Sequence, residues 1–327
     1  MVGSFVEAHC WSVPRLPGAD ESQRASAYVR ECAGKGLAVA LGAHRLGATV
    51  DLLMAVGHDA AGDAALQLLE RDGLPAAHVH RLGAHSAHGC GLLGADGETS
   101  VTVFTGANDL LGAQQLQPVI PCLHHAAVAY AQCEAPLALV ADALHAARRA
   151  GVLTVLNPSP WPAEGMRSAV GAQALAAADV LVVNRSEALP LLSRWVGEHH
   201  AWTQEEGMSP ALESLPALVL HAVWRQWAGR WLIITLGAQG CVAYGRDDSV
   251  VIHQPSHPVR SVQPIGAGDA FSAGLCTALA EGQSMASALA LANVCGALAA
   301  SRNGILTTLP QRVEVDAFVA QEQPVQN

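Results

Sequence analysis

Short runs of β-branched and apolar residues alternate along the chain with longer Ala- and Leu-rich segments that have helical periodicity. Such alternation is typical of βαβ units, and it predicts an α/β fold whose mostly parallel central sheet is covered by helices on both faces. Right-handed crossovers bring the carboxyl ends of parallel strands to one edge, so the residues after each strand are candidates for a functional site. The central strands are expected at Thr49–Val56, Ala126–Ala131, Val152–Asn157, Asp179–Asn184 and Trp231–Leu236.

Two segments interrupt this alternation and predict a β-hairpin. His88–Gly94 and Thr99–Thr105 have period-2 patterning and flank a turn that contains the dipeptide Asp96-Gly97. Together with the segment from about Val13 to Val29, this hairpin is expected to form a small separate sheet that covers the site edge as a lid. We therefore expect a single domain, 1–327, with lid segments at about 13–29 and 88–105.

Two stretches are expected to lie outside the core. Val196–Pro216 is polar and rich in His, Trp and Glu, which indicates a surface insertion. Gln321–Asn327 is expected to be a frayed terminus.

Charge and cysteine usage narrow the class of protein. The formal net charge is -10, only 14% of the residues are charged, and no cluster of Lys or Arg is longer than a pair, which argues against a nucleic-acid partner. The eight cysteines are scattered, without a C-x-x-C pair or a Cys/His ligand spacing. They are expected to be buried free thiols in a reducing compartment. The N-terminus lacks a signal-peptide pattern, and no run approaches the roughly 18 to 20 apolar residues of a membrane span, so a cytoplasmic location is expected.

The strongest chemical signal is the run Pro264–Phe271, which opens an apolar helix extending to about Ala280. Small residues at a helix start let a ligand approach the backbone closely, and the free N–H groups and the helix dipole favour an anion there. Asp269 in the first turn is a candidate general base beside the position where phosphoryl charge would be stabilised. The alternative is that Asp269 only stabilises the helix N-terminus.

The sequence around this run points to a nucleotide site. Thr235–Gly240 is a strand end followed by a glycine turn, and Asn293 lies in the helix after the Asp269 helix. In this order of motifs the chain resembles, over nearly its whole length, the ribokinase-like (PfkB) carbohydrate kinase family, whose late signature has the form D-T-x-G-A-G-D. The resemblance implies a three-layer αβα sandwich with a β-sheet lid, and ATP-dependent phosphoryl transfer to a small-molecule hydroxyl.

The resemblance also implies roles for individual residues. Asp269 matches the catalytic base, and the amides of Gly266, Ala267 and Gly268 match the anion hole. The family's Asn-x-x-Glu, linked to Mg²⁺ and phosphate, is present as Asn184 and Glu187; the alternative is that these two residues form a helix-capping box. The resemblance places ATP along two strand ends and the glycine turn, and against the later helix that carries Asn293; the residues are Asn184, Thr235, Gly237, Gly240 and Asn293.

The family's early signature, G-G-K-G-x-N, is represented by Ala33–Ala38, in which Gly34 and Lys35 match substrate-facing positions. Lys35 does not belong to a Walker P-loop, because Gly36 stands where Ser or Thr would bind magnesium. Its alternative is a solvated lysine at a helix start. Further matches to family turns are mostly architectural, and they lie at Gly57–Gly62, Thr105–Asn108 and Gln132–Pro136. Glu134 in the last of them is expected to line the substrate cleft.

The departures from the family pattern concern the acceptor. Val6 and Ala8 replace the Asn and Asp that hold sugar hydroxyls in G-S-x-N-x-D, and Ala38 replaces the Asn of the early signature. An unpaired buried hydroxyl costs on the order of 1 to 3 kcal/mol, so ordinary ribose is a poor expected acceptor and a less polar molecule is favoured. His9, Trp11 and Glu134 are the candidates for new contacts, although His9 points to the opposite face of its strand in the aligned register.

Position 263 bears on the use of a monovalent cation. Gln263 replaces the first Asp of the late signature, which argues against the monovalent-cation site that some relatives build from this loop.

The main hypothesis is transfer of the γ-phosphoryl group of MgATP to a primary hydroxyl of a sugar or sugar-like molecule. The alternatives are a nucleoside kinase of the same fold, a non-catalytic nucleotide or metabolite sensor, and a dinucleotide oxidoreductase; the last lacks a G-x-G-x-x-G after the first strand. A homodimer that pairs through the lid is a further hypothesis.

Overall fold

The computed structural model describes residues 1–96, 98–160, 165, 168–196, 212–247, 250–262 and 265–322. In these ranges a six-stranded central sheet has the order β12-β11-β10-β9-β8-β7. Strands β7 to β10 are parallel, and β11 and β12 extend the sheet antiparallel. The strands are β7 (Val128–Gln132), β8 (Leu153–Asn157), β9 (Val180–Asn184), β10 (Trp231–Thr235), β11 (Cys241–Gly245) and β12 (Val251–Gln254). The strands expected from Ala126 onward are therefore confirmed.

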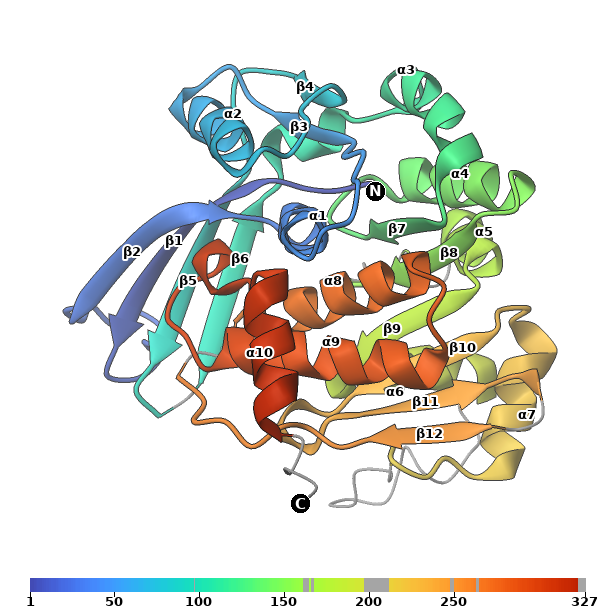
Figure 1. Ribbon diagram of the computed structural model, residues 1–327. Helices are drawn as coiled ribbons and strands as arrows, with labels where there is room; N and C mark the ends of the chain where they lie inside the picture. The colour runs from blue at the N-terminus through green and yellow to red at the C-terminus, as the bar shows by residue number, and fades with distance from the viewer. Residues whose placement is uncertain are drawn as a thin grey trace.

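Helices cover both faces of this sheet, as the predicted three-layer sandwich requires (Figure 1). Alternate residues of β9 separate the two layers, because Val180 and Val182 pack in one hydrophobic cluster and Leu181 and Val183 in the other. The first cluster includes α1 (Lys35–Arg45), α2 (Ala60–Asp72), α8 (Ala267–Ala280), α9 (Met285–Ala300) and α10 (Arg312–Glu322). The second includes α3 (Ala113–Leu116), α4 (Leu137–Arg149), α5 (Ala169–Ala177), α6 (Arg185–Val196) and α7 (Ala217–Gln226). Short 3₁₀ segments are η1 (Gly106–Leu110), η2 (Gln117–His125), η5 (Gly237–Gln239) and η7 (Leu306–Thr308).

The expected central strand Thr49–Val56 is wrong in extent and in place. Only Met54–Val56 forms a strand, β3, and it pairs with β4 (Val79–Arg81) in a separate two-stranded sheet. The start of the chain occupies the position between β3 and β7. The N–H of Val2 donates to the carbonyl of Tyr130 at 2.9 Å, and the N–H of Gly3 donates to the carbonyl of Leu53 at 2.8 Å.

A four-stranded sheet, which we call the lid sheet, projects from the sandwich, with the order β2-β1-β5-β6 among the described residues (Figure 1). The strands are β1 (Val6–Val13), β2 (Ala27–Ala33), β5 (His88–Gly94) and β6 (Thr99–Phe104). The expected hairpin is confirmed as antiparallel β5 and β6. The lid segment expected at about Val13–Val29 is misplaced, because the strands β1 and β2 flank it. Residues 14–26 connect these two strands, and they contain Pro17, Gly18 and a turn in which Asp20 has φ 60°.

Three further expectations concern a membrane span, the cysteines and the two stretches outside the core. Among the described residues, none of the helices combines the length and the hydropathy of a membrane span. The eight cysteines are free, but only four of them are buried as expected: Cys133, Cys241, Cys276 and Cys295. Cys90 on β5 is exposed, and the remaining three are half-buried: Cys10, Cys32 and Cys122. Most of the expected surface insertion, residues 197–211, lies outside the described ranges. So does most of the expected frayed terminus, residues 323–327. Gln263 and Pro264 also lie outside them.

Candidate active site

Helix α8 begins in an open glycine-rich turn. Gly266 is the N-cap residue, with φ 84° in the left-handed region that favours glycine. A Cβ atom added to Gly268 would meet no heavy atom within 4 Å, so this face of the first turn is open. The backbone N–H groups of an open helix N-terminus can receive an anion, which fits the predicted role of this segment. The predicted extent of the helix to Ala280 is confirmed.

Asp269 lies in the first turn of α8 and is partly buried. Burial raises the pKa of its carboxyl to about 6, against the opposing effect of the nearby Lys35 ammonium, and the Glu134 and Glu187 carboxylates raise the pKa further. Asp269 in turn is the main cause that raises the pKa of Lys35. These four side chains therefore share one electrostatic neighbourhood. Lys35 is partly buried rather than fully solvated, and it is the single lysine of the chain.

Glu134 connects the end of β7 to the start of α1. Its Oε2 accepts a hydrogen bond from the backbone N–H of Lys35 at 3.0 Å and from the Ser4 hydroxyl at 2.5 Å. Helix α1 has Gly34 as its N-cap residue, without a side-chain hydrogen bond, so the Glu134 carboxylate supplies the missing acceptor. The amide of Gln132 donates to the Ser4 oxygen at 3.0 Å and completes the support. Ser4 and Gln132 are supporting residues that no sequence motif indicated, although Gln132 ends a buried strand, the position at which site residues are expected.

Asn184 and Glu187 form the capping box that was the alternative to a metal role. The N–H of Glu187 donates to Asn184 Oδ1 at 2.9 Å, and the N–H of Asn184 donates to Glu187 Oε2 at 3.0 Å. The box begins α6 at the carboxyl end of β9. Because the Glu187 carboxylate also raises the pKa of Asp269, capping does not remove Glu187 from the neighbourhood of the candidate base.

The residues predicted to contact a nucleotide divide into two groups. Thr235 ends β10 directly opposite Asn184 of β9, so both lie at the same edge of the sheet. Gly237 and Gly240 have φ values of 61° and 89°, which the glycine turn requires. Asn293 is 6% exposed and has a different setting, because its amide donates to the carbonyls of Gln254 at 3.1 Å and Pro255 at 3.2 Å and so fixes the segment after β12.

The lid sheet presents its inner face to the start of α8. Glu31 of β2 accepts a hydrogen bond from the backbone of Ile305, whose carbonyl lies 3.6 Å from a Cβ built on Gly266. Ala8 pairs with Glu31 and so shares this inner face. Ala8 is 7% exposed and Ala38 of α1 only 1% exposed, so both predicted acceptor positions are apolar and buried.

The prediction that His9 and Trp11 provide new acceptor contacts is wrong. Both alternate with Ala8 along β1 and therefore lie on the outer face of the lid sheet. His9 Nδ1 is 2.8 Å from the Tyr28 hydroxyl of β2, and the His9 and Trp11 rings stack. Strand β1 keeps the register in which Val6 and Ala8 occupy the Asn and Asp positions of the family signature. A shift of one residue would have been needed to turn His9 and Trp11 inward.

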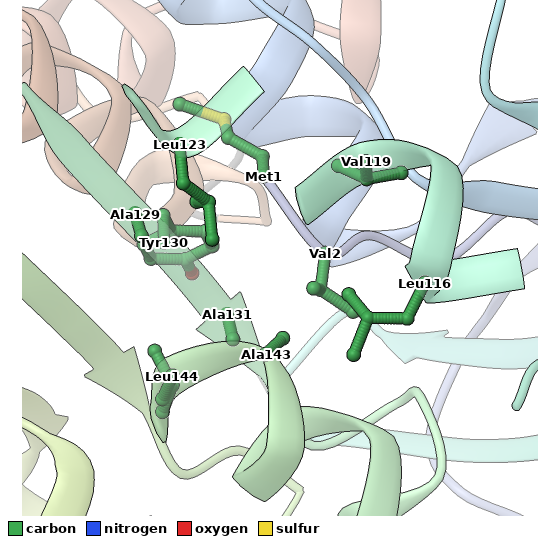
Figure 2. A pocket seen from close by; sticks show the side chains of 10 residues that line it. All are labelled: Met1, Val2, Leu116, Val119, Leu123, Ala129, Tyr130, Ala131, Ala143 and Leu144. Atoms are coloured by element: carbon green, nitrogen blue, oxygen red, sulfur yellow. The ribbon is translucent and has the colours of Figure 1, made fainter. Parts of the chain in front are cut away.

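A small cavity elsewhere in the fold is not the site. It holds about 30 Å³ and is lined by side chains of the N-terminal segment, α3, η2, β7 and α4, including Met1, Val2 and Leu123 (Figure 2). Its volume is that of about one water molecule. The residues that line it include neither Lys35 nor Asp269.

Known proteins resemble this chain over nearly its full length. Ribokinase from Mus musculus is 26% identical over 318 residues, which cover 96% of this chain and 92% of that protein. Fructokinase-1 from Oryza sativa subsp. japonica is 27% identical over 337 residues, with 96% of each chain covered.

Solved structures share the fold. The ribokinase of Giardia lamblia has a TM-score of 0.82 at 19% identity, with 98% of this chain and 97% of that chain covered. The nucleoside kinase of Burkholderia thailandensis, in complex with inosine, has a TM-score of 0.76 at 22% identity, with 98% and 96% covered.

A family model described as pfkB family carbohydrate kinase matches residues 2–312. The match spans the lid, the central sheet and the α8 turn with Asp269. The chain therefore belongs to the pfkB family of carbohydrate kinases.

Proposed function

We propose that this ATP-dependent carbohydrate kinase moves the γ-phosphoryl group of ATP to a hydroxyl of a sugar or sugar-like molecule, with Asp269 as the general base. The observation that carries the proposal is a carboxyl group at the open N-terminus of α8 whose pKa is raised to about 6. Such a carboxyl is mostly ionised at neutral pH, and it accepts a proton more readily than an ordinary aspartate.

The surrounding groups supply positioning and charge. Phosphoryl transfer depends mainly on alignment and on stabilising the charge of the migrating group. The backbone N–H groups of Gly266, Ala267 and Gly268 and the α8 dipole would stabilise that charge, and the Lys35 ammonium adds a positive charge beside Asp269.

The nucleotide would lie along the carboxyl edge of the central sheet. Thr235 and Asn184 end neighbouring strands there, and the turn with Gly237 and Gly240 follows directly. Asn293 would act by fixing the segment after β12, since its amide already donates to Gln254 and Pro255.

The acidic groups near Asp269 fit a magnesium ion. Mg²⁺ prefers oxygen ligands and keeps several waters, so Glu187 would hold it and Asn184 would contact it through water. When bound, the ion neutralises the negative charge of the ATP phosphates. Potassium activation is not part of the proposal.

The inner face of the lid sheet supports a second candidate class of acceptor. Apart from Glu31 of β2, this face is largely apolar: it carries Val6, Ala8 and Gly89, and Val101 and Val103 of β6, which are 63% and 40% exposed. An apolar surface of this kind suits a flat apolar group on the acceptor, which favours a nucleoside as the alternative to a free sugar. The Burkholderia thailandensis nucleoside kinase, solved with inosine, has this fold.

A panel of acceptors tests the proposal directly. Sugars, sugar phosphates, polyols and nucleosides are each supplied with MgATP, and acceptor-dependent release of ADP is measured. Turnover with a sugar supports the main proposal, and turnover with nucleosides alone supports the second candidate. Tight ATP binding without turnover on any acceptor would instead favour a non-catalytic nucleotide sensor.

Two further expectations belong to this proposal. The eight free cysteines fit a reducing compartment, so we place the reaction in the cytoplasm. Pairing of two subunits through the lid stays a prediction, which the molecular mass in solution tests.

A further inference from the structure

The outer face of the lid sheet carries ionisable side chains that the proposed phosphoryl transfer does not use. Glu7 and His9 lie two residues apart on β1 and therefore point to the same side of the sheet. Strand pairing places His88 of β5 directly beside Glu7, on the same face. Ala8, between Glu7 and His9, points to the inner face, so the cluster lies on the side of the lid away from the α8 turn.

Both imidazole rings approach the same carboxylate oxygen. His9 Nε2 lies 3.1 Å and His88 Nδ1 lies 3.3 Å from Glu7 Oε2. The three candidate ligand atoms all lie within 4.8 Å of one another. Bonds of about 2.0 to 2.1 Å at a tetrahedral angle separate two ligand atoms by roughly 3.3 Å, so the spacing around Glu7 Oε2 is that of ligands sharing one ion.

Neighbouring groups hold these ligands in place. Arg30 donates from Nε at 2.9 Å and from Nη2 at 2.6 Å to the other oxygen of Glu7, Oε1. The Tyr28 hydroxyl lies 2.8 Å from His9 Nδ1, which fixes the ring with Nε2 toward Glu7. Hydrogen bonds of this kind to the far atoms of a carboxylate and an imidazole are what orient the ligands of protein metal sites.

The charge state and the access to the cluster also suit a metal ion. The Arg30 guanidinium pairs with Glu7 Oε1 and offsets the burial of this carboxylate, which leaves Oε2 to face the two imidazoles. The Glu7 side chain is 7% exposed, while those of His9 and His88 are 26% and 39% exposed. The cluster therefore has the Glu7 carboxylate at its buried end and an open side on which water can complete the coordination.

We propose that Glu7, His9 and His88 form a binding site for a divalent transition-metal ion, for which zinc is the best match. Two imidazoles and one carboxylate are an established ligand set for zinc, whereas Mg²⁺ prefers oxygen ligands alone. The site is separate from the proposed magnesium position at Glu187, and it does not depend on the proposed reaction. A bound ion joins β1 to β5 and so stiffens the lid sheet.

A second cluster of candidate metal ligands must be distinguished from Glu7, His9 and His88 in any binding test. Asp51, His78 and Cys122 also place ligand atoms within 4.8 Å of one another, with Cys122 Sγ 3.6 Å from His78 Nε2. It contains a thiol, so cobalt bound there gives a thiolate charge-transfer absorption, whereas cobalt bound to Glu7, His9 and His88 does not. His78→Ala removes an imidazole from this second cluster and leaves the lid cluster intact.

The test is a zinc titration of the full chain carrying His78→Ala, in competition with a chromophoric chelator. We expect a zinc site that His88→Ala weakens by about 10- to 100-fold or more, and that Tyr28→Phe weakens by about 10-fold. His253→Ala, which removes an exposed histidine from β12, is the matched control and should leave the affinity unchanged. His88 is itself partly exposed, so its variant is expected to fold, and circular dichroism checks this.

Three results would overturn the proposal. The first is equal zinc affinity in the His88→Ala and His253→Ala variants, and the second is no zinc binding in their shared parent. The third comes from the chain without His78→Ala: a cobalt spectrum that consists only of a thiolate band abolished by Cys122→Ser would assign metal binding to the second cluster alone.

Discussion

The backbone N–H of Lys35 donates to the carboxylate of Glu134 at 3.0 Å. This single contact caps α1 and also places a negative charge beside the Lys35 side chain, whose ammonium and the Asp269 carboxylate influence each other's pKa. The start of α1 and the start of α8 are thereby coupled electrostatically. Changes at Lys35 and at Glu134 should alter the acidity of Asp269 in opposite directions.

That coupling predicts opposite shifts in the pH dependence of turnover. Asp269 must be ionised to accept a proton, so kcat/KM should fall below about pH 6. Lys35→Met removes the charge that lowers the pKa of Asp269, so the acid limb should move to higher pH. Glu134→Gln keeps an oxygen for the Lys35 N–H but removes a charge that raises this pKa, so the acid limb should move to lower pH. Profiles of kcat/KM for the two variants check this, and shifts in the same direction would contradict it.

The chain offers a direct probe of the site because Lys35 is its single lysine. Reductive methylation should modify Lys35 and the N-terminal amine, and the two products separate by peptide mass spectrometry. If Lys35 faces the reacting groups, MgATP together with an acceptor should slow its modification by about 10-fold or more, on the order of 1.4 kcal/mol of protection. The Met1 amine serves as the internal control. Equal protection of both amines, or of neither, would remove Lys35 from the site.

The raised pKa of Asp269 also predicts a stability effect. Its value of about 6 lies above the ordinary 3.8, so folding favours the protonated form. The contribution of this group to stability is fully present below about pH 4 and is lost as the pH rises through about 6. Asp269→Asn imitates the protonated form, so it should raise the free energy of unfolding at pH 8 by on the order of 2 kcal/mol, with little difference at pH 4. Denaturant unfolding at both pH values measures this, and a variant less stable than the parent at pH 8 would refute it.

Local patterns were enough to predict much of the fold. The β9 run Val180–Asn184 and its neighbours are short, apolar and bounded by turns, and the run into α8 contains its own helix-start residues. These signals depend on neighbouring residues and need no knowledge of distant contacts.

The errors arise where distant segments decide the structure. Val2 and Gly3 take the place between β3 and β7 through hydrogen bonds to Tyr130 and Leu53, and no local pattern reports such a pairing. The prediction for His9 failed for a different reason, because alternation along β1 already places His9 on the face opposite Ala8 and only a shift of register would have turned it inward. The role of Glu134 as the cap of α1 depends on a contact with a helix that begins far from it in the sequence.

The central claim is that Asp269 removes the proton of the attacking hydroxyl at the open turn of α8. The most direct test is steady-state turnover of Asp269→Asn with the acceptor found in the panel, alongside its binding of ATP. We predict that turnover falls by at least about 10²-fold while the affinity for ATP stays within a few fold of the parent. Turnover close to that of the parent would contradict the claim.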